Sequence, residues 1–200
     1  MSESPPLLEG RTIRLDPLSR LHLPGLCAVG LDEELWRITT SVARTPAEME
    51  AYVAEALRER EAGTALPFVT VERASGQIIG STRFGNIDRR HRRAEIGWTW
   101  LARPWQRTAA NTEAKYLMLG HAFDAWGLQR VEFKTDRLNE RSRAALLRIG
   151  AREEGVLRRH MITWNGRVRD SVYFAILDEE WPAVKARLEQ LLGERGPIPH

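Results

Sequence analysis

The sequence predicts a single α+β domain, built on a mixed, mostly antiparallel central sheet of about seven strands that is flanked by helices. The first observation is the order of hydrophobic periodicities: strand, two helices, three strands, helix, strand, helix, two strands, helix. The second is a length of 200 residues with 42% hydrophobic residues, which suits one core. The third is the near balance of 30 basic and 27 acidic residues, which excludes a mainly disordered chain. We therefore expect one domain over residues 1–200, with an ordered core from about residue 8 to 192 and a frayed tail at 193–200.

The first quarter of the chain predicts one strand and two helices. Leu8–Leu15 has the alternation of a half-buried strand, with Ile13 and Leu15 on one face. Ser19 can cap a short helix that runs to Val29. A second helix begins at Thr45–Glu48, where a capping box coincides with proline at the first helical position, and Gly63 ends it.

Three strands and a long helix follow. The segments at 66–73, 77–86 and 94–101 are rich in Val, Ile, Phe and Trp, and short polar connections between them favour an antiparallel meander. From Ala114 the apolar residues keep one helical face, and Gly127 provides the stop.

The last third predicts a strand, a helix, a hairpin and a final helix. The strand covers 130–135, and Asn139 can cap a helix that Gly150 closes. Two further strands flank Asn165-Gly166, a pair typical of a type I′ hairpin turn. The final helix is expected at 181–192.

The composition indicates a cytoplasmic protein without a structural metal. Cys27 is the only cysteine, so no disulfide within the chain is possible, and it is best interpreted as a small core residue. No cluster has metal-ligand spacing, no apolar run is long enough to span a membrane, and the first residues lack the pattern of a signal peptide.

The segment between the third meander strand and the long helix predicts an anion site. Thr108, Ala109 and Ala110 are small enough for a ligand to approach the main chain, and the helix start offers unpaired N–H groups with partial positive charge. Gln106 and Arg107 add donors at the same rim.

The same segment carries a family resemblance. Gln106–Asn111 follows the pattern Gln/Arg-x-x-Gly-x-Gly/Ala, with alanine at 109 in place of the first glycine and Asn111 in place of the second small residue. Further matching segments are 111–115, 130–136, 139–142, 154–158 and 180–182. On these residues, roughly from 8 to 192, the chain resembles the GNAT superfamily of acetyl-CoA-dependent N-acetyltransferases. It is most similar to the bacterial RimJ/RimL-like branch of ribosomal-protein alanine acetyltransferases.

The resemblance implies an acetyl-CoA site and a role for each residue around it. Backbone groups near Trp100 and Leu101 would pair with the pantetheine arm. The pyrophosphate would be held by Gln106, Arg107, Thr108, Ala109, Ala110, Asn111 and Thr112. Asn139 would contact the pantetheine amides, with Ser142 near the thiol end; the alternative for Asn139 is a helix cap alone.

The implied chemistry is attack of a neutral amine on the thioester. An α-amine, with a pKa of about 7.7–8.0, needs roughly 1 kcal/mol to deprotonate at pH 7, whereas lysine needs about 4–5 kcal/mol. A carboxylate could therefore suffice as base, and Glu95 is the candidate; the alternative is a solvated strand residue. Many relatives carry a tyrosine acid four residues after the Ser142 equivalent, but this chain has Leu146, so Ser142 or solvent would protonate the thiolate.

The acceptor is the least determined part. Trp36 and His160 are candidates for its pocket, with core packing and half-exposure as their alternative roles; His121 is interpreted as a core histidine. The acceptor we expect is a protein or peptide N-terminal α-amine, including that of a ribosomal protein. The alternatives are a small amine, or a non-catalytic module of this fold that binds CoA or RNA.

Other partners are constrained by charge. The basic run at 89–93 is interpreted as a solvated connection, with ribosomal RNA or an acidic surface as the alternative ligand. No interleaved aromatic and basic face accompanies it, so nucleic acid is not expected as the main partner, and neither is a membrane. A homodimer through the C-terminal strands or the final helix remains open.

Overall fold

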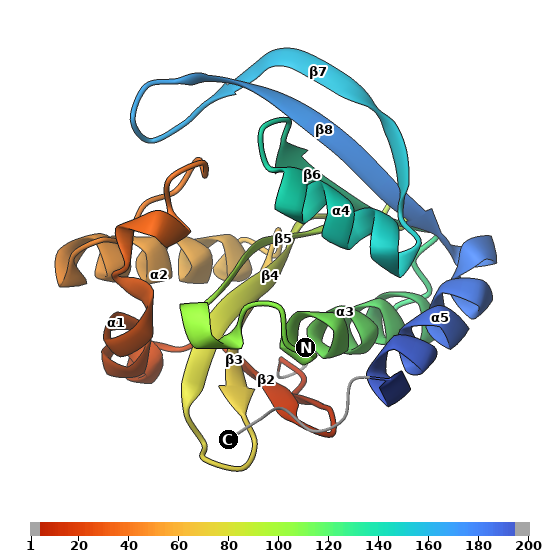
Figure 1. The fold of residues 1–200 in the computed structure, drawn as a ribbon, viewed down its shortest axis with the longest axis horizontal. Coiled ribbons are helices and arrows are strands. Elements are labelled where there is room, and N and C mark those ends of the chain that lie inside the picture. The colour runs from red at the N-terminus through yellow and green to blue at the C-terminus, as the bar shows by residue number, and fades with distance from the viewer. Residues whose placement is uncertain (1–4, 195–200) are drawn as a thin grey trace.

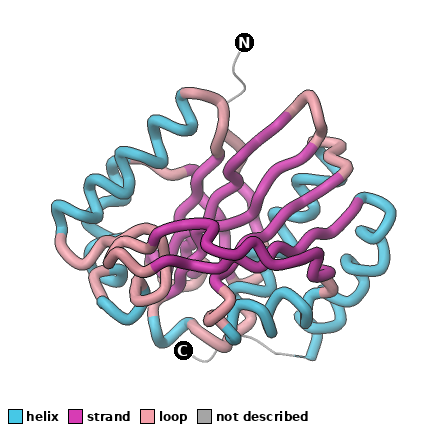
Figure 2. Tube along the Cα trace, turned by 90° about the horizontal axis from the view of Figure 1, so that it is seen from above, coloured by secondary structure: helices cyan, strands magenta, loops and turns pink. Residues whose placement is uncertain are grey.

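The computed structural model describes residues 5–194. These residues form an eight-stranded sheet in the order β1-β2-β3-β4-β5-β6-β8-β7, with helices on both faces (Figures 1 and 2). All neighbouring strands are antiparallel except β5 and β6, which are parallel. The predicted class is confirmed, with one strand more than expected. The predicted frayed tail lies, from residue 195 onward, outside the described residues.

The extra strand comes from the N-terminal segment. The predicted strand at 8–15 is in fact a small hairpin of β1 (Leu8–Glu9) and β2 (Ile13–Pro17). The turn between them is held by Glu113, whose carboxylate accepts from the amides of Arg11 and Thr12. This contact joins residues about a hundred positions apart, so local periodicity could not reveal the turn.

The two N-terminal helices cover one face of the sheet. α1 (Leu23–Gly30) follows a short 3-10 turn, and α2 (Pro46–Glu61) begins where predicted, with Thr45 Oγ1 accepting from the amide of Glu48 at 3.2 Å. The cluster that they form with the sheet contains Trp36, Tyr52 and Trp100.

The meander forms as predicted, with three register shifts, of which one bears on the site. β3 (Leu66–Glu72), β4 (Ile78–Asp88) and β5 (Arg93–Leu101) pair antiparallel in sequence. The β4–β5 register shifts by one residue next to Trp98, whose φ is +50°. This shift marks a β-bulge in β5. After the bulge Thr99 faces α3, whereas Trp98 and Trp100 pack with α2 on the opposite face of the sheet.

The other helices cover the opposite face. α3 spans Ala110–Gly120, begins one turn earlier than its apolar stripe indicated, and continues as a π-helical turn over His121–Ala125. After β6 (Arg130–Asp136), α4 spans Glu140–Ile149 and α5 spans Trp181–Glu194. The larger apolar cluster lies between these helices and the sheet.

The C-terminal hairpin reaches across the molecule. β7 (Arg152–Ile162) and β8 (Val168–Leu177) arch over β6, and their tip approaches the segment between α1 and α2 (Figure 1). There the Trp164 indole N–H donates to the carbonyl of Trp36 at 2.7 Å. The turn is not of the predicted type I′. That type needs a positive φ at both Asn165 and Gly166, and only Gly166 has one, of +83°.

Within residues 5–194, none of the helices combines the length and the apolar character needed to cross a membrane.

Candidate active site

The central feature of the site is the separation of β5 from β6. These strands pair over only three residues, Arg93–Glu95 against Arg130–Glu132. Beyond that point β5 continues to Leu101 alongside β4, while β6 continues to Asp136 alongside β8. The facing edges of the two strands therefore leave backbone donors and acceptors for another partner.

The turn that follows β5 is fixed by its own side chains. Gln106 Nε2 donates to the carbonyl of Leu101 at 2.8 Å, and Gln106 Oε1 accepts from Arg141 on α4 at 2.8 Å. Arg107 adopts a φ of +66°, the conformation for which glycine is usually chosen. Gln106 therefore braces the turn and joins it to α4, and its predicted contact with a ligand stays a prediction.

The start of α3 combines a local cap with the backbone donors of a first helical turn. Thr108 Oγ1 donates to the carbonyl of Trp105 and accepts from the amide of Ala110 at 3.2 Å. Ala109 is the N-cap and provides no side-chain cap. The amides of Asn111 and Thr112 belong to the first helical turn, where helix geometry supplies no intrahelical acceptor. The turn thus has the donors of an anion site without the family glycines.

The start of α4 is joined to that turn. Asn139 caps the helix, its Oδ1 accepting from the amide of Ser142 at 3.0 Å. The cap uses the carbonyl oxygen and leaves the amide NH₂ group for other contacts. The contact of Arg141 with Gln106 places the start of α4, which carries Asn139 and Ser142, next to this turn.

A buried charged group lies where the strands part, on the face of α1 and α2. Glu95 is 4% exposed; its carboxylate accepts from Asn86 Nδ2 at 2.8 Å and pairs with Lys134 Nζ at 3.2 Å. The alternative of a solvated strand residue is therefore wrong. Lys134 Nζ lies 5.8 Å from the ring centroid of Tyr173, and that ring lies 5.7 Å from the ring of His160.

The predicted acceptor residues have different surroundings. Burial, followed by the positive charges of Lys134 and Arg169, lowers the pKa of His160, which favours the neutral imidazole at pH 7. Trp36 is not at the surface: it is 2% exposed, and its indole N–H donates to the carbonyl of Gly30 at 2.8 Å. The expected role of Trp36 in a pocket wall is thus corrected to core packing, because its aromatic neighbours enclose the ring.

A buried lysine next to the separated strands was not expected from the sequence. Lys115 on α3 is 5% exposed, and burial lowers its pKa to about 7. Its side chain lies in the apolar stripe that includes Met118 and Ala122, so a lysine at helical spacing from buried residues was the available signal.

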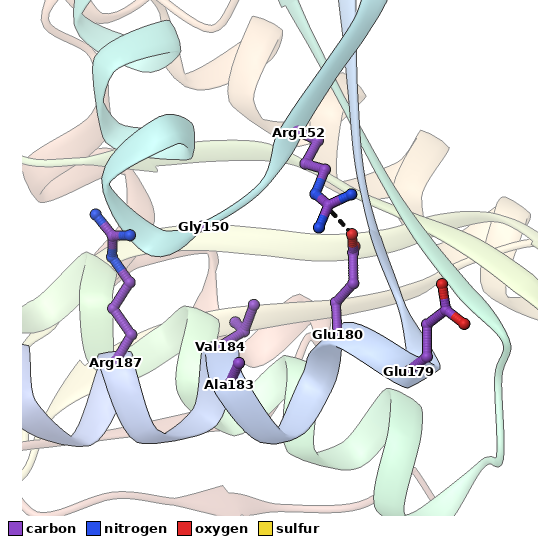
Figure 3. A pocket seen from close by; sticks show the side chains of 7 residues that line it. All are labelled: Gly150, Arg152, Glu179, Glu180, Ala183, Val184 and Arg187. Carbon is purple, nitrogen blue, oxygen red and sulfur yellow. Dashed lines mark ion pairs between the residues drawn. The ribbon is translucent and has the colours of Figure 1, made fainter.

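Two surface hollows lie outside this arrangement. The larger, of about 470 Å³, lies between the end of α4 and α5 (Figure 3) and is lined by Gly150, Arg152, Glu179, Glu180, Ala183, Val184 and Arg187. Arg152 and Glu180 pair across it at 2.8 Å. The smaller, of about 270 Å³, borders the residues just before the turn. Among the described residues, no group of three or more His, Cys, Asp or Glu side chains could hold a metal ion.

Comparison with known proteins gives a consistent result. A family model described as "Acetyltransferase (GNAT) domain" matches residues 12–152. The chain is similar to a Bacillus subtilis strain 168 protein named "Putative ribosomal N-acetyltransferase YdaF", with 36% identity over 110 residues, or 55% of this chain and 59% of that protein. The alignment thus spans less than two thirds of this curated relative.

Two solved structures match over nearly the whole chain. A GCN5-related N-acetyltransferase from Brucella melitensis has a TM-score of 0.86 at 33% identity, covering 95% of this chain and 86% of that one. The Mycobacterium smegmatis RimJ structure in complex with CoA-disulfide has a TM-score of 0.81 at 26% identity, covering 98% of each chain.

Proposed function

Because this chain belongs to the GNAT acetyltransferase family, we propose that it transfers an acetyl group from acetyl-CoA to a primary amine, specifically a protein or peptide N-terminal α-amine. The observation that carries the proposal is the parting of β5 and β6 directly after Glu95 and Glu132, with the buried Glu95 carboxylate at that point. A cytoplasmic location remains part of the proposal.

The donor would bind along the separated strands. Backbone groups of β5 near Trp100 and Leu101 would pair with the pantetheine amides, as a ligand strand pairs with a sheet edge. The amides of the turn and of the first turn of α3, over residues 106–112, would hold the pyrophosphate, since a helix N-terminus favours anions. Asn139 would use its free NH₂ group on a pantetheine carbonyl. The similar Mycobacterium smegmatis RimJ structure, a complex with CoA-disulfide, supports this assignment.

The acceptor would approach from the face of α1 and α2, where Glu95 lies. The neutral amine attacks the thioester carbonyl, and Glu95 accepts the proton that the nitrogen loses, directly or through a water. Lys134 and Asn86 hold the carboxylate in position for this transfer. His160 would line the same pocket. An α-amine suits such a site because little free energy is needed to deprotonate it at neutral pH.

The proposal is tested first by donor binding. Isothermal titration with acetyl-CoA should show saturable heat, and the ligand should raise the melting temperature of the protein. The absence of both effects at millimolar acetyl-CoA would overturn the assignment to this enzyme class.

The acceptor is tested by a screen in which free thiol is measured. An array of peptides with unblocked N-termini, including those of ribosomal proteins, is compared with a set of amino acids, polyamines and amine-bearing antibiotics. Turnover with the peptides supports the proposal. Turnover with the small amines alone moves the chain to a small-molecule acetyltransferase, and CoA binding without turnover makes it a binding module.

A further inference from the structure

Lys115 lies beneath the separated strands, on the α3 side. Its Nζ donates to Thr99 Oγ1 on β5 at 3.1 Å and lies 5.8 Å from the ring centroid of Phe133 on β6. Both partners come after the last β5–β6 pair, so the amine bridges the strands where they no longer bind each other. Thr99 itself is exposed. The hydroxyl group of Thr99 thus lies between the Lys115 amine and the space that separates the two strands.

This ammonium is under-compensated. The other two lysines of the chain pair with carboxylates, Lys134 with Glu95 and Lys185 with Asp124, whereas within the described residues no ion pair includes Lys115. Its contacts on β5 and β6 are Thr99 and Phe133, and Thr99 Oγ1 lies in turn 2.8 Å from Thr82 Oγ1 on β4; none of these three side chains titrates. A buried charge without a partner is costly, and retaining one requires a compensating reason.

The proposed reaction lacks an assigned acid. Leu146, at the family tyrosine position, is 7% exposed and packs in the larger core cluster. Ser142 has a hydroxyl group, which is a much weaker acid than an ammonium group.

We propose that Lys115 is the proton donor to the thiolate that leaves acetyl-CoA. The inference rests on the proposed function. The amine nitrogen forms a bond to the acetyl carbon, the carbon–sulfur bond breaks, and its electron pair goes to sulfur. The nitrogen loses its proton to Glu95, and sulfur takes one from the Lys115 ammonium, which gives the amide and CoA thiol. Solvent then reprotonates Lys115 and accepts the proton of Glu95, so the chain returns to its starting state.

The ammonium is suited to this step. A thiol with a pKa of about 8.5 is a weaker acid than an ammonium with a pKa of about 7, so proton transfer to the thiolate is downhill. The acid must be protonated, and therefore kcat should fall as pH rises through the pKa of Lys115.

The test compares Lys115→Met with Lys185→Met, a half-buried lysine on α5 that pairs with Asp124. Methionine keeps the length and apolar volume, so the Lys115 variant should melt at or above the wild-type temperature. We expect kcat to fall about 10²-fold in Lys115→Met and to lose its decline at alkaline pH, with the dissociation constant for acetyl-CoA within about threefold of wild type. Lys185→Met should behave as wild type.

A second measurement does not depend on turnover. The ultraviolet absorbance of the thiolate reports the titration of CoA bound to the protein, with desulfo-CoA as the blank. A nearby ammonium should make bound CoA titrate at lower pH in the wild type than in Lys115→Met. An unchanged kcat profile, or a loss of rate with identical thiol titrations, would show that Lys115 only supports the fold. If no amine is acetylated by the wild type, the proposed function fails, while the thiol titration still decides whether Lys115 faces the sulfur.

Discussion

Two buried charged residues on α3, two positions apart, differ in how many groups compensate their charge. Glu113 is 3% exposed, and its carboxylate accepts from the amides of Arg11, Thr12 and Ile13 and from the hydroxyl of Thr12. Lys115 is equally buried and has a single hydroxyl partner. Burial alone therefore says little about the role of a charge; the number of groups that compensate it distinguishes a structural residue from a candidate for chemistry.

The strongest test of this contrast is Glu113→Ala. Removing the carboxylate leaves three amides of the N-terminal hairpin without their acceptor, and we expect the free energy of unfolding to fall by about 3–5 kcal/mol. Urea unfolding followed by tryptophan fluorescence measures it, with the exposed Glu50→Ala as the control. A loss below about 1 kcal/mol would mean that the hairpin does not depend on Glu113.

The pH dependence of stability tests Lys115, the second residue of this comparison. The pKa of Lys115 is lower in the folded chain than in the unfolded chain, so between pH 7 and about 10 the unfolded chain binds the extra proton, and stability rises with pH. Lys115→Met lacks this contribution. Its stability advantage at pH 7 should shrink by about 2–4 kcal/mol towards pH 10 in urea unfolding, whereas a constant difference would contradict the buried amine.

Glu95 lies between the two cases, because it is buried with two partners and faces the side proposed for the acceptor. Glu95→Gln should lower kcat/KM for the peptide amine about 10- to 100-fold, most strongly at low pH, where the amine most needs a base. The affinity for acetyl-CoA should not change. Steady-state rates across pH measure this, and equal rates at every pH would remove Glu95 from the mechanism.

The smallest expected effects concern Asn139, whose two candidate roles are the cap of α4 and a contact with the cofactor. Asn139→Ala should cost about 1 kcal/mol of stability, because the cap of α4 is lost, while Asn139→Asp keeps an acceptor and should be nearly as stable as wild type. Both variants lack the NH₂ group, and both should bind acetyl-CoA more weakly by calorimetry. Full affinity in Asn139→Asp would leave only the capping role.

Features set by neighbouring residues could be predicted from the sequence, whereas features set by contacts between distant residues could not. The caps of α2 and α4 are set by neighbouring residues, and Thr45 and Asn139 were located correctly. The N-terminal hairpin depends on Glu113, a residue far along the chain, and it was missed. The enclosure of Trp36 by Tyr52 and Trp100 likewise arises only when separate elements pack together.

The candidate site divides in the same way. The turn at 106–112 and the start of α4 could be located from pattern and resemblance, because each is one continuous segment. The partners of Glu95 and Lys115 come from three different strands, and only the folded sheet shows which charges are compensated.

The bulge at Trp98 has a consequence for how this chain can vary. Glu95 and Thr99 are four positions apart, and a regular strand would point both side chains to the same layer. The additional residue of the bulge reverses this alternation, so the Glu95 carboxylate faces the side of α1 and α2 while the Thr99 hydroxyl faces α3. Deleting one residue at the bulge would move every later side chain of β5 to the opposite face of the sheet. No single substitution could reverse that change.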